Sequence, residues 1–352
     1  MTGAAGLADR LLAPLDGARR RAFGEALRVP WLASWLARRD RRLAAQSSLG
    51  VALLFAATLG APGALYVLGP ALLGVAHVAS DVRYLVLRRG VPRAWSRLAL
   101  AAGALMVLVR AAPLAGLPAA GLARAEVVIG WGWVAAGAIA GARAGRRPLR
   151  ALALLAPVLA AGVAAWRAPG PAALVFAYAH NVVALILWVA LFRRRRAFAL
   201  PALALAAGGA ALFASGALSA AASGGPWGAR LFDDACRALP DASAPTAFGA
   251  ALSYVFLQAI HYSVWLAWVP QDDVRGEGTL SFRMSARSLA RDFGAPGLAL
   301  VAALALAVAG ASLASPHRTR NLYLSLATFH GYLELASLAF FVARGRRRRP
   351  PP

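Results

Sequence analysis

Ten apolar segments run through the chain, and they constrain its fold more than any other feature of the sequence. Their approximate spans are 46–67, 70–88, 98–119, 125–143, 149–166, 171–192, 198–222, 247–269, 296–315 and 320–343. Several reach about 20 residues, the length of helix that crosses the hydrocarbon core of a bilayer. Hydrophobic residues make up 60% of the 352 residues, more than in an ordinary soluble domain. The sequence therefore predicts an all-α fold, a polytopic transmembrane helical bundle of about ten helices.

Arginine clusters alternate along the chain in a way that supports this count. They lie at 38–42, 88–97, 143–150, 193–196, 275–291 and 344–349, whereas the intervening loops carry fewer arginines. Cytoplasmic loops of membrane proteins are enriched in Arg and Lys. The pattern therefore predicts that both termini are cytoplasmic, and we expect a bacterial inner membrane as the location. It also accounts for much of the net charge of +24 without a nucleic-acid partner.

Three regions follow from these patterns. Residues 1–43 combine many arginines with scattered Leu and Trp, and Pro14 and Pro30 are expected to interrupt any helix there. This segment is typical either of short amphipathic helices on an anionic leaflet or of a solvated basic tail. Residues 44–343 are expected to form the transmembrane bundle. Residues 344–352 are expected to be a basic, disordered C-terminal tail.

Four of the five histidines lie inside apolar segments. His77, His180, His261 and His330 fall in the second, sixth, eighth and tenth segments, which run in the same direction across the membrane in the predicted topology. At about 1.5 Å rise per residue, their depths agree within about 10 Å. Ionisable residues inside a membrane usually face the bundle interior and mark a functional site. The four histidines are therefore candidate ligands of a shared centre.

Two of these histidines are followed by an acid one helical turn later. Asp81 follows His77 and Glu334 follows His330 at i+4, so each pair shares a helix face. Neutral imidazole and carboxylate bind Fe, Mn, Zn or Cu. The four histidines could hold one metal, with Asp81 and Glu334 as supporting or catalytic groups beside it, or two metals that share these carboxylates. A single membrane histidine is equally typical of a hydrogen bond between helices, and an ion pair of Asp81 with Arg83 or Arg110 is also possible.

Several neighbours of the histidines are further candidates. Amide groups orient histidine ligands, so Asn181 and Gln258 are expected to support the site. Arg110, inside the third segment, could neutralise an acid or meet an acidic substrate headgroup. Tyr262 and Tyr332, each close in sequence to a histidine, are weaker candidates for a catalytic role.

The segments His77-x-x-x-Asp81 and His330-Gly331-x-x-Glu334 resemble the His-Gly-x-x-Asp type of motif in the Brp/Blh family. Members of that family are integral-membrane, iron-dependent dioxygenases that cleave β-carotene to retinal. The resemblance covers these short motifs only. It implies that His77 and His330 are iron ligands, completed by His180 and His261. The chain departs from the family pattern in having Glu334 in place of Asp and in lacking a second histidine after His261.

Three hypotheses of function follow. The first is an intramembrane, metal-dependent oxygenase, with non-haem iron favoured over Cu or Zn, that acts on a lipophilic substrate such as a carotenoid or other isoprenoid. The second is a bis-histidine haem protein that passes electrons across the membrane. The third is an ion- or proton-coupled transporter that uses Asp81, Arg110 and Glu334 as relay groups. The sequence lacks a phosphate-binding Gly-x-x-x-x-Gly-Lys loop, so nucleotide-driven work is not expected.

Overall fold

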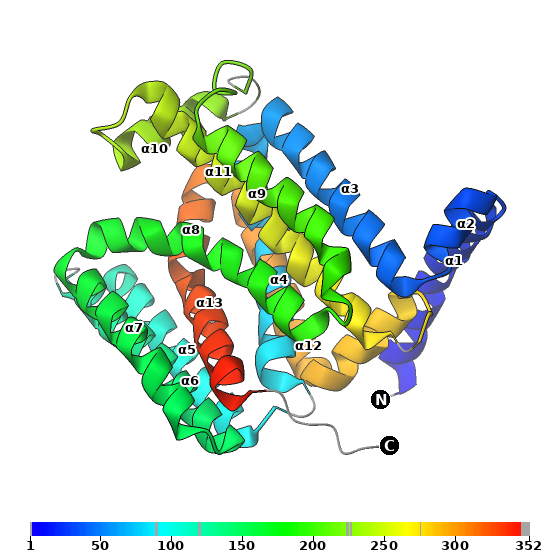
Figure 1. Cartoon of the computed structure of the whole chain (residues 1–352), viewed down its shortest axis with the longest axis horizontal. Coiled ribbons are helices and arrows are strands. Elements are labelled where there is room, and N and C mark those ends of the chain that lie inside the picture. The colour runs from blue at the N-terminus through cyan, green and yellow to red at the C-terminus, as the bar shows by residue number, and fades with distance from the viewer. Residues whose placement is uncertain are drawn as a thin grey trace. The chain divides into compact units, whose positions relative to one another are not determined.

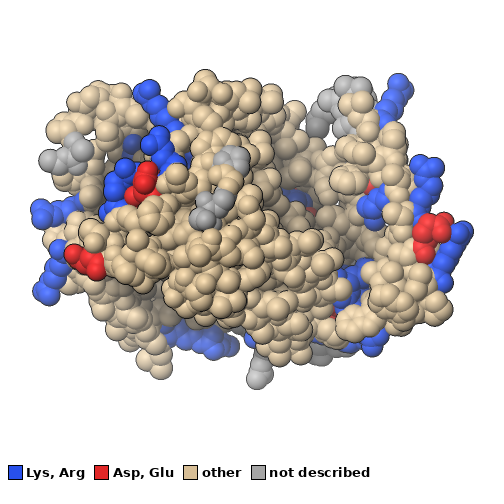
Figure 2. All heavy atoms as spheres, turned by 90° about the horizontal axis from the view of Figure 1, so that it is seen from above, with Lys and Arg blue, Asp and Glu red and all other residues tan. Residues whose placement is uncertain are grey.

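The part of the chain that the structure describes is mostly helical and contains no β-strand. The structure is a computed structural model that describes residues 2–88, 91–118, 121–222, 225, 227–274 and 276–345, with side chains from Arg10 onward. Within these ranges it contains thirteen α-helices with short 3-10 and π-helical turns. Ten of the described helical segments are long and apolar enough to cross a membrane, which confirms the predicted ten-span, all-α architecture. Uncharged side chains predominate on the face seen in Figure 2, and arginines form separate patches on it.

The first of two compact units contains Met1–Ala76 and Trp188–Ala307. Its helices are α1 (Thr2–Leu27), α2 (Pro30–Leu36), α3 (Arg39–Gly60), the first part of α4 (Pro62–Val82), α9 (Leu200–Ala214), α10 (Gly228–Ala238), α11 (Ala244–Ser263) and most of α12 (Phe282–Ala314). Helix α11 contacts α3 and α9 in its core. There the Phe256 ring lies 5.9 Å from the Phe55 ring and 5.6 Å from the Phe213 ring, between ring centroids.

The N-terminal segment is helical and contacts α12. Helix α1 continues through Pro14, where a break was expected, whereas Pro30 begins α2. Asp16 accepts hydrogen bonds from the backbone N–H groups of Phe282 and Arg283, at 2.9 and 3.2 Å, and so caps the first turn of α12. Burial raises the pKa of Asp16, but these donors and the Arg283 guanidinium outweigh it and hold the pKa below its usual value of 3.8.

Helix α12 is longer than the apolar segment predicted at 296–315. It begins at Phe282, and its backbone is non-helical at Gly294 (φ 67°, ψ 172°). A positive φ is readily adopted only by glycine, so Gly294 separates a polar first part from the apolar part that follows. The predicted C-terminal tail lies largely outside the described residues, because α13 ends at Arg344 and the description ends at Gly345.

The second unit contains His77–Leu187 and Val308–Pro352. Its helices are the end of α4 from His77, α5 (Arg93–Ala111), α6 (Leu122–Gly145), α7 (Pro148–Arg167), α8 (Pro169–Leu187), the end of α12 and α13 (Pro316–Arg344). Helix α13 is central to this unit, because it contacts α5, α6, α7 and α8 (Figure 1).

Glycines on α6 bring that helix into direct contact with the backbone of α13. Gly137, Gly141 and Gly145 recur every four residues, the small-residue spacing that lets membrane helices approach closely. A Cβ added at Gly137 would lie 2.5 Å from the carbonyl oxygen of Ala336. Gly141 and Gly145 approach the backbone of Phe340 and Arg344 in the same way. The glycine face of α6 therefore fixes the position of α13.

Candidate metal centre

Three helices of the second unit bring candidate ligands together. His77 and Asp81 lie near the end of α4, His180 lies on α8, and His330 lies on α13. His77 is 1% exposed, Asp81 0% and His330 6%, whereas His180 is half-buried. Directly after Asp81 and Val82, α4 passes into a π-helical turn, η1 (Arg83–Leu87). Such turns occur often at functional sites.

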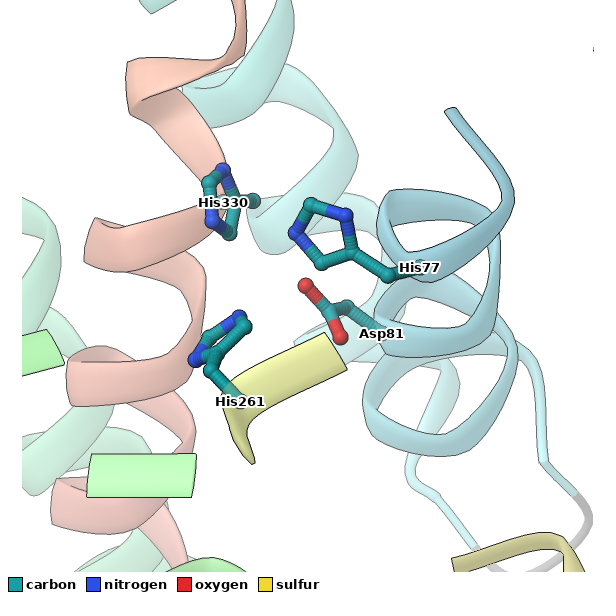
Figure 3. A group of neighbouring side chains, drawn as sticks. All are labelled: His77, Asp81, His261 and His330. Carbon is teal, nitrogen blue, oxygen red and sulfur yellow. The ribbon is translucent and has the colours of Figure 1, made fainter. Parts of the chain in front are cut away.

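His77, Asp81 and His330 have the spacing that a metal site requires. Figure 3 shows the His77 ring and the Asp81 carboxylate on α4 facing the His330 ring on α13. One ligand atom from each of the three lies within 4.8 Å of the others. Ligands of one ion, each about 2.0–2.2 Å from it, lie up to about 4 Å apart. Small side-chain rotations are therefore sufficient to bring the three onto one ion.

The backbone orients two of the imidazole rings. Nδ1 of His330 donates to the carbonyl oxygen of Ala327, and Nδ1 of His180 donates to that of Phe176 at 3.3 Å. A carbonyl oxygen only accepts, so in both rings the proton is on Nδ1 and the lone pair is on Nε2. Metal-binding histidines are typically held this way, with one ring nitrogen hydrogen-bonded and the other directed to the metal.

The carboxylate of Asp81 shows best whether these residues fit a metal. Both of its carboxylate oxygens are buried and have no hydrogen-bond partner among the described residues. The carboxyl group of Glu334, which is 0% exposed, lies nearby. A buried carboxylate is costly unless it is paired or coordinates a metal. The donor set therefore fits a cation beside His77 and His330.

His180 lies beside this group. Its ring centroid is 5.3 Å from that of His330, in an edge-to-face arrangement, while the His77 ring centroid is 4.8 Å from that of His330. The structure thus brings together His77, His180 and His330, together with Asp81. That His180 is a direct ligand stays a prediction.

Gly331 allows α8 to approach this position. A Cβ at Gly331 would lie 2.9 Å from the Phe176 ring and 3.4 Å from the Cβ of His180. The glycine directly after His330 therefore sets the distance between α13 and α8. Asn181, next to His180, is 1% exposed and donates through its side chain to the Ala177 carbonyl at 3.0 Å. Its side-chain oxygen has no hydrogen-bond partner in the described part of the chain.

The other candidates from the sequence belong to α11 in the first unit. His261, Gln258 and Tyr262 are all buried there, and the His261 and Tyr262 ring centroids are 6.0 Å apart. The Tyr262 ring packs against Gly69, where a Cβ would lie 3.3 Å from it. Their predicted roles as a metal ligand, a supporting residue and a catalytic residue stay predictions.

Arg110 has a partner that sequence analysis did not single out. Its guanidinium forms an ion pair with Glu126 on α6 at 2.5 Å. The Tyr332 ring packs against Gly130, one helical turn after Glu126, and it stacks on Phe176 at 4.3 Å between centroids. Glu126 could have been recognised from the sequence as a candidate, because it lies inside an apolar segment and acids are rare in membrane helices.

Comparisons of the chain with protein-family models, with curated proteins and with solved structures gave no match.

Proposed function

We propose that the protein is an intramembrane, metal-dependent oxygenase that uses non-haem iron and acts on a lipophilic substrate. The observation that carries this proposal is the convergence of His77, Asp81 and His330, three buried ligands within 4.8 Å of one another. Two histidines and one carboxylate are the ligand set of many non-haem iron oxygenases.

Each residue has a distinct part in this proposal. His77, Asp81 and His330 would hold the iron, and the hydrogen bond from Nδ1 of His330 to the Ala327 carbonyl leaves Nε2 as the nitrogen that would bind it. When bound, the iron supplies the site at which O₂ binds and is activated. Glu334 adds a second buried carboxyl group beside Asp81. The apolar helices exclude bulk water from reactive groups.

A lipophilic substrate is supported by the surroundings of the site. The helices that carry these ligands are among the ten that are long and apolar enough to cross a membrane. A substrate dissolved in the bilayer can reach residues at this depth without passing through water. The motif resemblance to the Brp/Blh family points to the same class, a carotenoid or other isoprenoid.

The ring contacts argue against haem between these histidines. The His77 and His330 rings meet edge to face at 4.8 Å, as do the His180 and His330 rings at 5.3 Å. Rings at these distances are in direct contact. A macrocycle between either pair would require the helices to separate.

Oxygen consumption tests the proposal. The purified protein is loaded with Fe(II) in lipid nanodiscs, and O₂ uptake is measured with and without β-carotene or a C20 isoprenoid in the bilayer. We expect substrate-dependent uptake in the wild type and none in His330→Ala, with His317→Ala as the matched control outside the site. Substrate-dependent uptake that is equal in all three proteins would refute the proposal. A Soret band in the iron-replete protein would favour the haem alternative, and metal-independent ion flux in liposomes would favour the transporter.

A further inference from the structure

A second polar cluster lies inside the second unit, apart from the proposed metal ligands. Arg110, in the last turn of α5, pairs with Glu126, near the start of α6. Both residues belong to helices that are long and apolar enough to span a membrane. Ionisable residues in such segments are costly and are functional candidates by default. Replacing a buried ion pair by apolar residues is often neutral or stabilising, so stability alone is a weak reason for this pair.

The cluster is accessible from outside the unit and has a donor that the ion pair does not use. The Arg110 side chain is 32% exposed and that of Glu126 is 12% exposed. The Nε of Arg110 is buried and has no hydrogen-bond partner among the described residues. A guanidinium has five N–H donors in a fixed fork, and an unsatisfied buried donor is costly. The exposed part of the Arg110 guanidinium therefore offers N–H donors to a bound molecule besides the nitrogen that pairs with Glu126.

Aromatic rings connect this cluster to the candidate metal centre. Tyr332 follows His330 by two residues on α13, and its ring packs against Gly130, one helical turn after Glu126 on α6. Its ring stacks on Phe176, and the Phe176 ring stacks in turn on His180 at 5.9 Å between centroids. A molecule bound at the ion pair would therefore lie beside the apolar and aromatic residues that lead to the histidines.

We infer that Arg110, Glu126 and Tyr332 bind the hydroxyl or carbonyl end group of the lipophilic substrate. Arg110 donates to the oxygen of either group, and Glu126 accepts from a hydroxyl. We expect an uncharged end group because the charges of Arg110 and Glu126 cancel each other. The Glu126 carboxylate would repel a carboxylate or phosphate, and the Arg110 guanidinium would repel an ammonium. This inference rests on the proposed function, because only that function makes the bound molecule a substrate. It narrows the substrate class to oxygenated isoprenoids or similar lipids.

Equilibrium binding of three matched probes tests the inference. Tritiated geranylgeraniol, the corresponding C20 hydrocarbon and geranylgeranoic acid are titrated into detergent-solubilised wild type. The variants are Arg110→Leu/Glu126→Leu, which removes both charges together, and Glu126→Gln, which keeps the shape of the side chain. A hydrogen bond to a charged group corresponds to a preference of about 10-fold or more. We expect the wild type to prefer the alcohol over the hydrocarbon by that factor, and the double variant to lose the preference.

Each other outcome contradicts the inference. Equal affinity of the wild type for alcohol and hydrocarbon, or an alcohol preference that persists in both variants, would show that the cluster does not bind the end group. Tightest binding of the acid would show a site for anionic headgroups instead. His330→Ala separates this result from the metal proposal, since that variant is expected to lose metal and to keep the alcohol preference. If Arg110→Leu/Glu126→Leu does not fold, Glu126→Gln alone is expected to lower the preference.

Discussion

Replacing Gly137 by alanine should separate α6 from α13 and weaken the candidate metal centre. The added Cβ would lie 2.5 Å from the Ala336 carbonyl oxygen and 3.3 Å from the Trp95 ring, whereas ordinary contact begins near 3.4 Å. A backbone carbonyl in a helix cannot rotate away, so the helices must move apart by close to 1 Å. Overpacking of this kind costs about 1–3 kcal/mol. We expect the free energy of unfolding to fall by that amount.

The assay is unfolding in mixed detergent–SDS micelles followed by circular dichroism, with iron content measured on the same samples. Gly132→Ala is the matched control on the same helix, because no atom lies within 4 Å of the added Cβ. An exposed Gly→Ala change in a helix gains up to about 1 kcal/mol. Gly132→Ala should therefore be unchanged or more stable, with full iron content. A Gly137→Ala protein as stable as Gly132→Ala, with unchanged iron, would refute the close-contact account of α13.

Three further predictions concern the site and the N-terminal segment. Gly331→Ala should push the Phe176 ring away from α13. Iron binding, measured by competition with a chelator, should weaken about 10-fold or more, which is the usual effect of losing a group that supports a metal ligand. Unchanged iron affinity would contradict the role given to Gly331. Asp81→Asn should lower iron affinity yet raise the thermal stability of the iron-free protein, because it removes a buried carboxylate that has no hydrogen-bond partner among the described residues. A less stable iron-free variant would contradict this. The hydrogen bonds of Asp16 hold its folded pKa below 3.8, so the stability they contribute is present above pH 3.8 and is lost as the pH falls through the folded pKa. The protection factor of the Phe282 amide against hydrogen exchange should therefore fall at low pH in the wild type, and at neutral pH it should be lower in Asp16→Ala than in the wild type.

The architecture could be predicted from the sequence because bilayer thickness sets helix length. All ten apolar segments correspond to helices, including the segment with His330 at its centre. The grouping of His77 with His330 was also predictable, since the predicted topology places both on segments that run in the same direction at similar depth. The break expected at Pro14 is wrong, because α1 continues through it.

Details of packing required the tertiary structure. The sequence offered Asp81 and Glu334 as partners for Arg110, but the structure pairs it with Glu126, whose helix follows α5 directly. Helix periodicity gives the face of each residue and not the neighbour that it meets. The contact of Gly137 with α13 could not be predicted for the same reason, although its spacing to Gly141 is visible in the sequence.

The metal content of the purified protein tests the central claim most directly. Wild type, His77→Ala, His330→Ala and His317→Ala are expressed with added iron, purified without chelators and analysed by elemental mass spectrometry. We predict near-stoichiometric iron in the wild type and in His317→Ala, and a loss of most of it in His77→Ala and His330→Ala. Wild-type protein without metal, or full metal retention in both site variants, would contradict a metal centre at His77, Asp81 and His330.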